Sequence, residues 1–333
     1  MSTAADRYRA KLAARAATMQ PVLGEAILRA WDEMARQLNP ARLAEAIRTG
    51  SADAVFGSVL TDDIMNATFA NVEELYLNQT LGNVGFFGKE LGVGFNVLSP
   101  GVLEAARTLD LKLVNELKGD LEGVIRESVT QGLKEGIGPR TIASRIKKDV
   151  GLTAKQLQYV DNFENQLKEG SRSALNRSLG RGAFRKPDGS IGYNPRHAGG
   201  TGVSKRDMAM LKSRLGSGKE LNPKQIDRIV ASYKRKLTAW HSETLARTAT
   251  VDSLKSAQYA ATEEAIRQGI LDQSLMKSEW VTAGDSKVRD EHVSMNGQVV
   301  QFGTPFSNGQ IIPGASDYNC RCIKRDFLGR EEI

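Results

Sequence analysis

Residues 279–322 read EWVTAGDSKVRDEHVSMNGQVVQFGTPFSNGQIIPGASDYNCRC, and this stretch decides the fold of the C-terminal third of the chain. The runs 279–281, 297–300 and 319–323 are short and lie next to clusters of Gly, Pro, Asn and Ser, a pattern that predicts three short strands. The polar segment 285–292 predicts a turn or one helical turn. We therefore expect a small lobe in which short strands surround a polar turn.

A long helix is predicted directly before this lobe, over residues 236–270. Gly269 is a suitable C-terminal stop for it. The prediction rests on apolar residues that recur at helical spacing, namely Ala246, Ala249, Val251, Leu254, Ala257, Ala261, Ala265 and Ile266.

One ordered set of residues runs through the long helix and the lobe: Leu245, Ala246, Arg247, Thr248, Glu279, Trp280, Val281, Asp285, Val288, Arg289, His292, Gly297, Phe302, Pro313, Gly314 and the ending Asn319, Cys320, Arg321, Cys322. Their order resembles the Mu F-like minor head protein family of tailed bacteriophages, also called the phage head morphogenesis domain. The resemblance covers residues 118–160 loosely and 230–325 closely. One position departs from the family pattern, because residue 249 is Ala where the family usually has Glu, so a contact between that Glu and Arg247 is absent.

The resemblance implies a minor capsid protein that acts in head morphogenesis at the portal or in the capsid interior. It also implies partners: the portal protein, the major capsid protein, or both, together with packaged double-stranded DNA that is bound non-specifically. Ejection with the genome is a further expectation of the family. The expected location is therefore the virion, in the head interior or at the portal vertex, after synthesis in the host cytoplasm.

Composition favours a mainly α-helical protein, and the strand and turn pattern adds a small C-terminal α+β lobe, so we expect long helices with short strands around 279–323. The chain has 333 residues, of which 40% are hydrophobic, so it can bury a real core. No apolar run approaches the roughly 18 residues that a membrane span needs, and the charged N-terminus does not read as a secretory signal. The only two cysteines, Cys320 and Cys322, are separated by one residue. They do not make the disulfide framework of a small secreted domain, so the cysteine content favours a reducing compartment.

Positive charge is concentrated in residues 165–236, which hold 17 basic and 5 acidic residues. Because the whole chain carries +7, the remainder is net negative. We predict that this basic insertion is partly flexible and meets DNA phosphates or an acidic protein surface, the alternative being a solvated segment with no partner. The candidate contact residues are Arg172, Arg177, Arg181, Arg185, Lys186, Arg196, Lys205 and Arg206.

The expected domains are a helical docking domain over 1–160, the basic insertion over 165–236, the Mu F-like module over 237–326 and a tail over 327–333. Within the first domain, residues 4–38 predict one amphipathic helix or two that are separated at Pro21. Five glycines and three phenylalanines in residues 80–98 predict an irregular segment there. A long helix is expected over 102–134, and Gly138-Pro139 starts another.

His292, Cys320 and Cys322 are candidate Zn²⁺ ligands, with Asp285, Asp290 or Asp317 as a fourth. On a strand the two thiols point to one face, with Cα atoms about 6.5–7 Å apart, which disfavours a disulfide bond between them. The alternative is that the two cysteines are reduced, buried and purely structural. No cofactor is expected, with zinc kept as the open possibility.

A structural polar network is the expected role of Arg247, Asp285, Arg289, His292, Asn319 and Arg321. If residues 285–292 are helical, then Asp285, Arg289 and His292 share one side of that helix. The chain has neither the zinc deaminase pattern nor His-Glu-x-x-His. We therefore expect a protein that is not an enzyme, and the rival hypothesis is a metal-dependent hydrolase or nuclease that uses His292, Cys320, Cys322 and Asp285.

Overall fold

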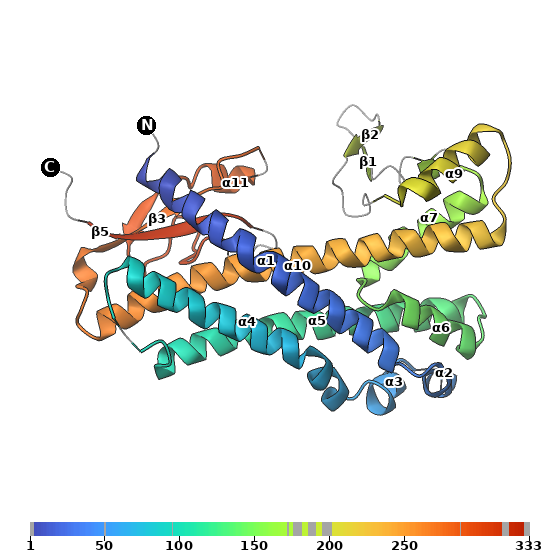
Figure 1. Ribbon diagram of the computed structural model, residues 1–333, viewed down its shortest axis with the longest axis horizontal. Coiled ribbons are helices and arrows are strands. Elements are labelled where there is room, and N and C mark those ends of the chain that lie inside the picture. The colour runs from blue at the N-terminus through green and yellow to red at the C-terminus, as the bar shows by residue number, and fades with distance from the viewer. Residues whose placement is uncertain are drawn as a thin grey trace. The chain divides into compact units, whose positions relative to one another are not determined.

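The computed structural model describes residues 3–49, 51–94, 96–171, 173–175, 182–185, 191–194, 202–286, 288–314 and 320–329. For residues 182–185, 191–194 and 216 it describes the backbone alone. The elements are α1 (Ala4–Gln37), α2 (Pro40–Arg48), α3 (Asp53–Ser58), α4 (Asp62–Glu90), α5 (Pro100–Lys134), α6 (Pro139–Asp149), α7 (Ala154–Lys168), β1 (Gly182–Arg185), β2 (Ile191–Asn194), α9 (Lys205–Gly216), α10 (Pro223–Arg267), η1 (Gln273–Leu275), β3 (Met276–Val281), α11 (Asp290–Val293), β4 (Val299–Gln301) and β5 (Ile323–Leu328) (Figure 1).

The protein is mainly α-helical and ends in a small α+β lobe, as its sequence predicts. It divides into two compact units. Unit 1 comprises residues 1–27, 69–115 and 243–333, and unit 2 comprises residues 28–68 and 116–242. Among the described residues, no helix combines the length and the apolar character that crossing a lipid bilayer requires.

Unit 2 is a helical body whose core lies between α7, α9 and the first part of α10. Phe163, Leu211, Ile229 and Tyr233 are fully buried there, and the rings of Phe163 and Tyr233 lie 4.7 Å apart. Ala174 and Val203, on the two sides of the central part of the basic insertion, belong to the same core.

Local capping signals set the helix ends of unit 2. The side chain of Asn39 accepts hydrogen bonds from the backbone N–H groups of Ala41 and Arg42, with Pro40 at the first helical position of α2. Thr153 forms a reciprocal capping box with Gln156 at the start of α7. The expected start of a helix at Pro139 is confirmed by α6.

Helix α4 corrects the prediction of an irregular segment over 80–98, because the helix continues through Gly82, Gly85 and Gly88 to Glu90. Each glycine costs about 1 kcal/mol relative to alanine. Burial outweighs this cost, since Val84 and Phe87 are both almost completely enclosed in the core of unit 1. Tertiary packing therefore overrides the weak intrinsic helix propensity of this stretch.

Buried polar contacts join the same stretch of α4 to the second half of α10, within unit 1. The hydroxyl of Tyr76 donates to the carbonyl of Ala249 over 2.8 Å. Asn83 Nδ2 donates to Ser253 Oγ over 2.9 Å, and Thr80 Oγ1 lies 3.0 Å from the same oxygen. These contacts fix the register of the two helices.

Two further helix predictions are resolved. Residues 4–37 form one helix with Pro21 inside it, so there is no separation at that proline. The helix expected over 236–270 is longer than predicted, because α10 begins at Pro223. Its end is as expected: Gly269 has φ +71°, and the N–H of Ile270 donates back to the carbonyl of Ala265.

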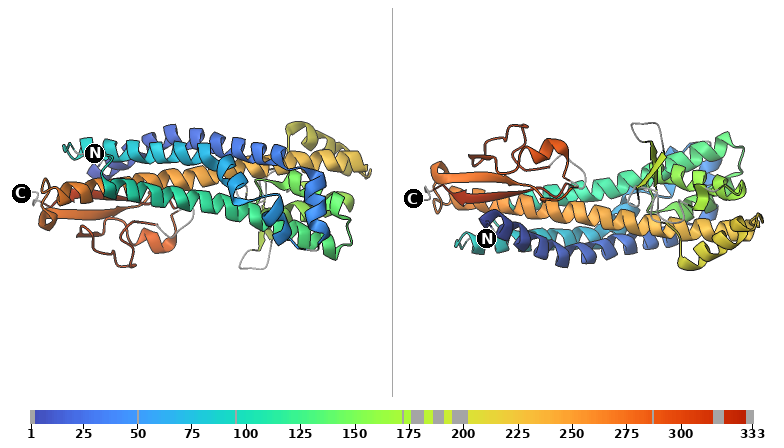
Figure 2. Two further views of the ribbon diagram at one scale, coloured as in Figure 1. Left: turned by 90° about the horizontal axis from the view of Figure 1, so that it is seen from below. Right: turned by 90° about the horizontal axis from the view of Figure 1, so that it is seen from above.

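The C-terminal lobe contains an antiparallel sheet with the strand order β4-β3-β5. Figures 1 and 2 show β3 and β5 beside the C-terminal part of α10. Register places Glu279 opposite Arg325, and the Arg325 guanidinium donates to the Glu279 carboxylate over 2.7 Å. Two of the expected strands are confirmed by β3 and β4, but the third is displaced, because β5 begins at Ile323 and leaves both cysteines in the segment before it.

A buried ammonium supports the junction between this sheet and α10. Lys324 is fully buried, and its Nζ lies 3.1 Å from Asp326 Oδ1 and 4.6 Å from the ring centres of Tyr259 and Phe302. Those two rings are stacked 5.1 Å apart. Charge pairing and the negative faces of two aromatic rings together compensate for the lost hydration of the ammonium.

Candidate functional site

Helix α11 positions His292 in the lobe. The helix has four residues, Asp290–Val293, and His292 is its buried member, with 3% of its surface exposed. The imidazole packs edge-on against Trp280 of β3 at 5.2 Å, and Phe306 packs on the same indole at 5.2 Å. Because the indole is fully buried, the imidazole is held in one place by the core of the lobe.

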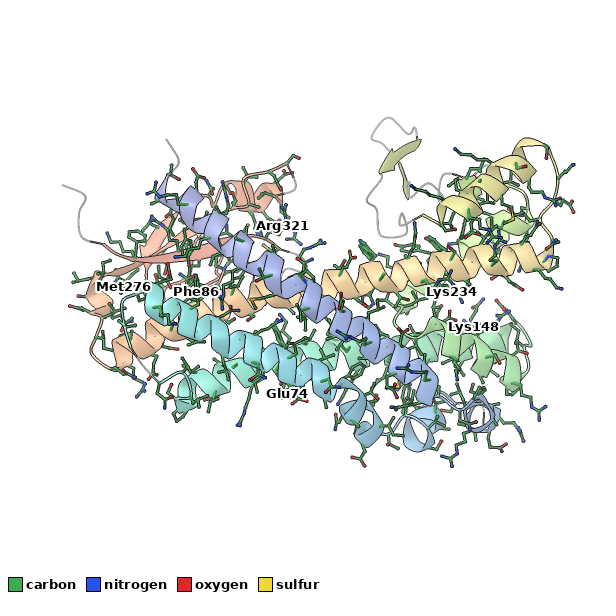
Figure 3. The ribbon with its side chains drawn as sticks, in the orientation of Figure 1. Glu74, Phe86, Lys148, Lys234, Met276 and Arg321 are labelled. Atoms are coloured by element: carbon green, nitrogen blue, oxygen red, sulfur yellow. The ribbon has the colours of Figure 1, made fainter. Side chains whose placement is uncertain are left out.

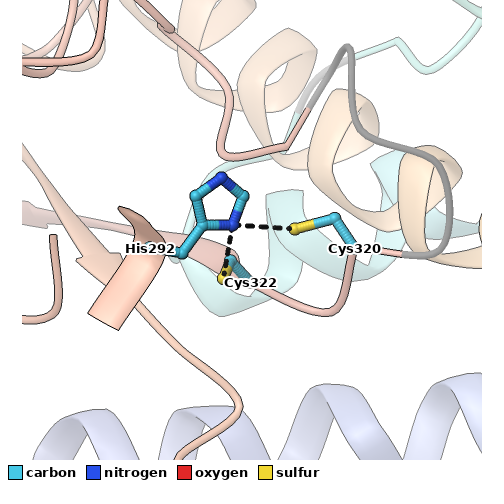
Figure 4. A group of neighbouring side chains, drawn as sticks. All are labelled: His292, Cys320 and Cys322. Carbon is cyan, nitrogen blue, oxygen red and sulfur yellow. Dashed lines mark hydrogen bonds between the residues drawn. The ribbon is translucent and has the colours of Figure 1, made fainter. Parts of the chain in front are cut away.

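Cys320 and Cys322 meet His292 from the segment that leads into β5. Both cysteines are buried and neither forms a disulfide bond. The Sγ atoms of both lie 3.6 Å from Nδ1 of His292 (Figure 4). His292, Cys320 and Cys322 could together hold a metal ion, because their ligand atoms all lie within 4.8 Å of one another. Within the described part of the chain, no other cluster of His, Cys, Asp and Glu side chains meets this condition.

Gly314 makes room for the Cys320 side chain. Its φ is +67°, and a Cβ built on it would lie 2.3 Å from Cys320 Sγ and 2.6 Å from Cys320 Cβ. The same point is 3.6 Å from Nζ of Lys255, a fully buried residue of α10. The Pro313-Gly314 pair of the sequence pattern therefore has a steric role beside the two thiols.

The two thiols share their protons unequally. The pKa of Cys320 is lowered to about 5, chiefly by a hydrogen bond from the Cys322 thiol, with the Lys255 ammonium and His292 adding to the effect. The pKa of Cys322 is raised, because it supplies that hydrogen bond and because it is buried. Burial lowers the pKa of Lys255. These shifts favour a thiolate at Cys320, and not at Cys322, beside the buried Lys255.

Asp285 and Arg321 form a bidentate ion pair at the edge of this cluster. The two guanidinium nitrogens of Arg321 lie 2.6 and 2.7 Å from the two carboxylate oxygens of Asp285. Asp285 and Arg289 both precede α11, so the condition under which they would share one helical side with His292, a helix over 285–292, is not met.

Of the predicted polar network, the Asp285–Arg321 pair is one element that the structure contains, and His292 lies with the two thiols. Arg289 is exposed at the start of α11, and Arg247 is half-buried on α10. Asn319 lies outside the described residues.

The expected fourth metal ligands are not brought to the cluster within the described residues. The carboxylate of Asp285 is occupied by Arg321, and Asp290 lies exposed in the first turn of α11. Asp317 lies outside the described residues. The hydrolase hypothesis thus loses Asp285 as a metal ligand. Sequence reasoning also missed Lys255, whose position on a helix rich in polar residues gives no sign that it is buried.

The predicted nucleic-acid contacts fall mostly outside the described residues, which exclude Arg172, Arg177, Arg181, Lys186, Arg196 and the side chain of Arg185. Lys205 and Arg206 are described, and both are exposed in the first turn of α9. Other exposed basic residues of the same unit are Lys212, Lys219, Lys224 and Arg235.

Some basic residues of the insertion serve internal contacts. Lys234, labelled in Figure 3, pairs with the buried carboxylate of Asp149. Arg228 Nε lies 3.0 Å from Asp207 Oδ1, and Lys236 donates to the carbonyl of Val203 over 2.9 Å. Among the described residues of the insertion, exposed positive charge is therefore carried mainly by α9 and by the start of α10.

Comparison with known proteins gives one match. No curated protein and no solved structure shows a significant match to the chain. A family model described as Phage Mu protein F like protein matches residues 215–325, which include α10, β3, β4, the first half of β5 and the His292–Cys320–Cys322 cluster. The match covers one third of the chain, and it shows that this segment is similar to the Phage Mu protein F like family.

Proposed function

We propose that this protein is a minor head protein of a tailed bacteriophage that acts in head morphogenesis. The observation that carries the proposal is the match of residues 215–325 to the Phage Mu protein F like family, a family of head morphogenesis proteins. We assign the protein a structural role and no catalytic activity. In support, the cavity beside His292 and the two cysteines measures about 20 Å³, which is room for about one water molecule and not for a substrate.

The proposed location is the virion, in the head interior or at the portal vertex, with the portal protein or the major capsid protein as the docking partner. The helical regions of residues 1–160 supply the docking surface in this proposal. Protease treatment of intact and of opened particles tests it. We expect the protein to be protected in intact particles and cleaved in opened ones, whereas cleavage in intact particles contradicts an interior location.

Contact with packaged DNA is the second element of the proposal, and the basic insertion supplies it. Its support is the charge count of 17 basic against 5 acidic residues, together with the exposed Lys205, Arg206 and Lys212 of α9. Side chains of this kind neutralise phosphates without reading bases, so affinity depends on salt and not on sequence. Ejection of the protein with the genome is compatible with such reversible binding.

Measurement of duplex DNA affinity at several salt concentrations tests this contact. One variant replaces five basic residues of the insertion by Gln at Arg177, Arg181, Arg185, Lys186 and Arg196. Its matched control removes the same charge from exposed positions elsewhere, at Arg42, Lys89, Lys134, Arg140 and Lys155. Substitution is preferable to deletion because Ala174 and Val203, on either side, belong to the core.

The insertion variant should lose about 0.9 from the slope of log affinity against log salt for each phosphate contact removed, a total of about 4.5 if all five residues contact phosphates. The control variant should keep the slope of the wild type. Equal slopes in the two variants would show that total charge, and not the insertion, governs binding. Retained DNA affinity in the insertion variant would refute the assignment.

A further inference from the structure

We propose that the lobe binds one Zn²⁺ ion through Nδ1 of His292 and the Sγ atoms of Cys320 and Cys322. The ion would join α11 to the segment that enters β5, across 28 residues of sequence. This inference concerns the lobe itself and does not rest on the proposed role in the phage head.

The distances between the ligand atoms are those of a tetrahedral zinc site. Zn–S bonds of about 2.3 Å and Zn–N bonds of about 2.0–2.1 Å at tetrahedral angles place nitrogen and sulfur about 3.5–3.6 Å apart. Both Sγ atoms lie 3.6 Å from Nδ1 of His292. The three ligand atoms also lie within 4.8 Å of one another, which includes the sulfur–sulfur separation.

Hydrogen bonding alone explains this arrangement less well. A neutral imidazole nitrogen has either one hydrogen to donate or one lone pair to accept with, so Nδ1 of His292 makes one good hydrogen bond. Here two sulfur atoms stand at the same distance from that nitrogen (Figure 4). An ion at the centre of the three atoms satisfies all of them at once.

The chemistry of the donors selects zinc. Two thiolates and an imidazole are a donor set that Zn²⁺ prefers over the hard oxygen ligands of Mg²⁺ or Ca²⁺. Two thiolates also cancel the two positive charges of the ion, so the buried ammonium of Lys255 faces a neutral centre. The rigid wall formed by Trp280 and Phe306 fixes the imidazole before the ion binds.

The fourth coordination position faces the small cavity that Ala283, Val288, Arg289 and Arg321 line together with the three ligands. Its volume of about 20 Å³ admits water or a small anion. The ion would therefore act as a cross-link in the lobe. Such a link is useful because the lobe has three short strands, one of which, β4, spans three residues.

Metal analysis and cobalt substitution of the full-length protein test the proposal. Protein refolded or purified with Zn²⁺ and then freed of excess metal should contain one zinc per chain. Replacement by Co²⁺ should give thiolate-to-cobalt charge-transfer absorption and strong tetrahedral d–d bands. The chain has two cysteines in total, so these absorption bands can arise only from Cys320 and Cys322.

Variants locate the site. Cys322→Ser and His292→Gln should each lose most of the bound zinc, and Cys322→Ser should weaken the charge-transfer band. Two controls keep the three ligands and the aromatic wall: Met295→Ala loosens the packing of the same lobe, and His241→Gln changes a buried histidine of unit 2. Both controls should retain one zinc per chain, with Met295→Ala less stable than the wild type.

The measurement on wild-type protein decides the matter even if a ligand variant fails to fold. Zinc binding together with the charge-transfer band supports the site. A wild-type protein that is folded but holds less than about a tenth of a zinc per chain after incubation with Zn²⁺ refutes it, given the tight binding expected of such donors. Zinc bound without any charge-transfer band in the cobalt form also refutes it, because the cysteines are then not ligands.

Discussion

Replacement of Gly314 by Ala tests whether the site depends on the absence of one methyl group. The new Cβ would lie 2.3 Å from Sγ and 2.6 Å from Cβ of Cys320, and φ at this position is +67°. Because Cys320 has a short side chain whose Cβ is also in collision, rotation of the thiol does not relieve the overlap, and the backbone must move.

A matched control separates the cost of the left-handed backbone conformation from the cost of the steric overlap with Cys320. A left-handed backbone conformation costs an Ala about 1–2 kcal/mol, and overpacking in a dense core costs about 1–3 kcal/mol more. We therefore expect Gly314→Ala to lower the free energy of unfolding by about 2–5 kcal/mol. Gly309 has φ +82° but no atom within 4 Å of its ideal Cβ, so Gly309→Ala should show only the first cost.

Two assays measure the effect, and both are run with a metal chelator so that the result does not depend on zinc. Denaturant titration gives the difference in unfolding free energy between the two variants. The rate at which a thiol reagent modifies the buried cysteines reports local opening around Cys320, and it should rise more in Gly314→Ala than in Gly309→Ala. Equal destabilisation and equal thiol reactivity in the two variants would refute the steric role of Gly314.

Three other predictions concern buried groups. Burial and the neighbouring Glu73 raise the pKa of Asp110 from 3.8 to about 7, and each tenfold change in proton affinity is worth about 1.4 kcal/mol. Between these two pH values the folded state holds a proton that the unfolded state has released, so the stability of the wild type should fall as pH rises from about 4 to 7. Asp110→Asn should remove this pH dependence, which thermal melts at a series of pH values would measure. Asp326→Ala should lower the free energy of unfolding by about 3–5 kcal/mol, because it leaves the Lys324 ammonium buried without its carboxylate. Lys324→Met should cost less, because Asp326 keeps the hydrogen bonds donated by the hydroxyl groups of Thr262 and Ser278. Gly151→Ala should destabilise unit 2 by about 2 kcal/mol or more, because φ is +85° and the added Cβ would lie 2.7 Å from Thr238. Calorimetry measures this loss, and a melting temperature equal to that of the wild type would contradict the prediction.

The sequence predicts those parts of the fold that depend on local chemistry. Gly269 ends α10 because its left-handed conformation closes the helix, and Pro139 begins α6 because its missing N–H costs nothing there. Helix α4 could not be predicted in this way. Its glycines read as a break, and only contacts with residues about 170 positions later in the chain, such as the bond from Asn83 to Ser253, compensate for them.

The sequence predicts the candidate metal ligands of the site but not the buried polar residues around them. His292, Cys320 and Cys322 are recognisable because their side chains are chemically distinctive, and the structure brings them together. Lys255, Gln258 and Thr262 are buried although hydropathy places such residues in solvent. Their burial follows from the packing of the lobe on α10, which no local pattern encodes.

The placement of the only two sulfhydryl groups of the chain in one enclosed cluster gives the protein a built-in reporter. A cysteine-specific dye would leave these two thiols unreacted for as long as the lobe stays closed, so labelling would report that the lobe has opened. No residue has to be introduced for this experiment, so the labelled molecule is the natural one.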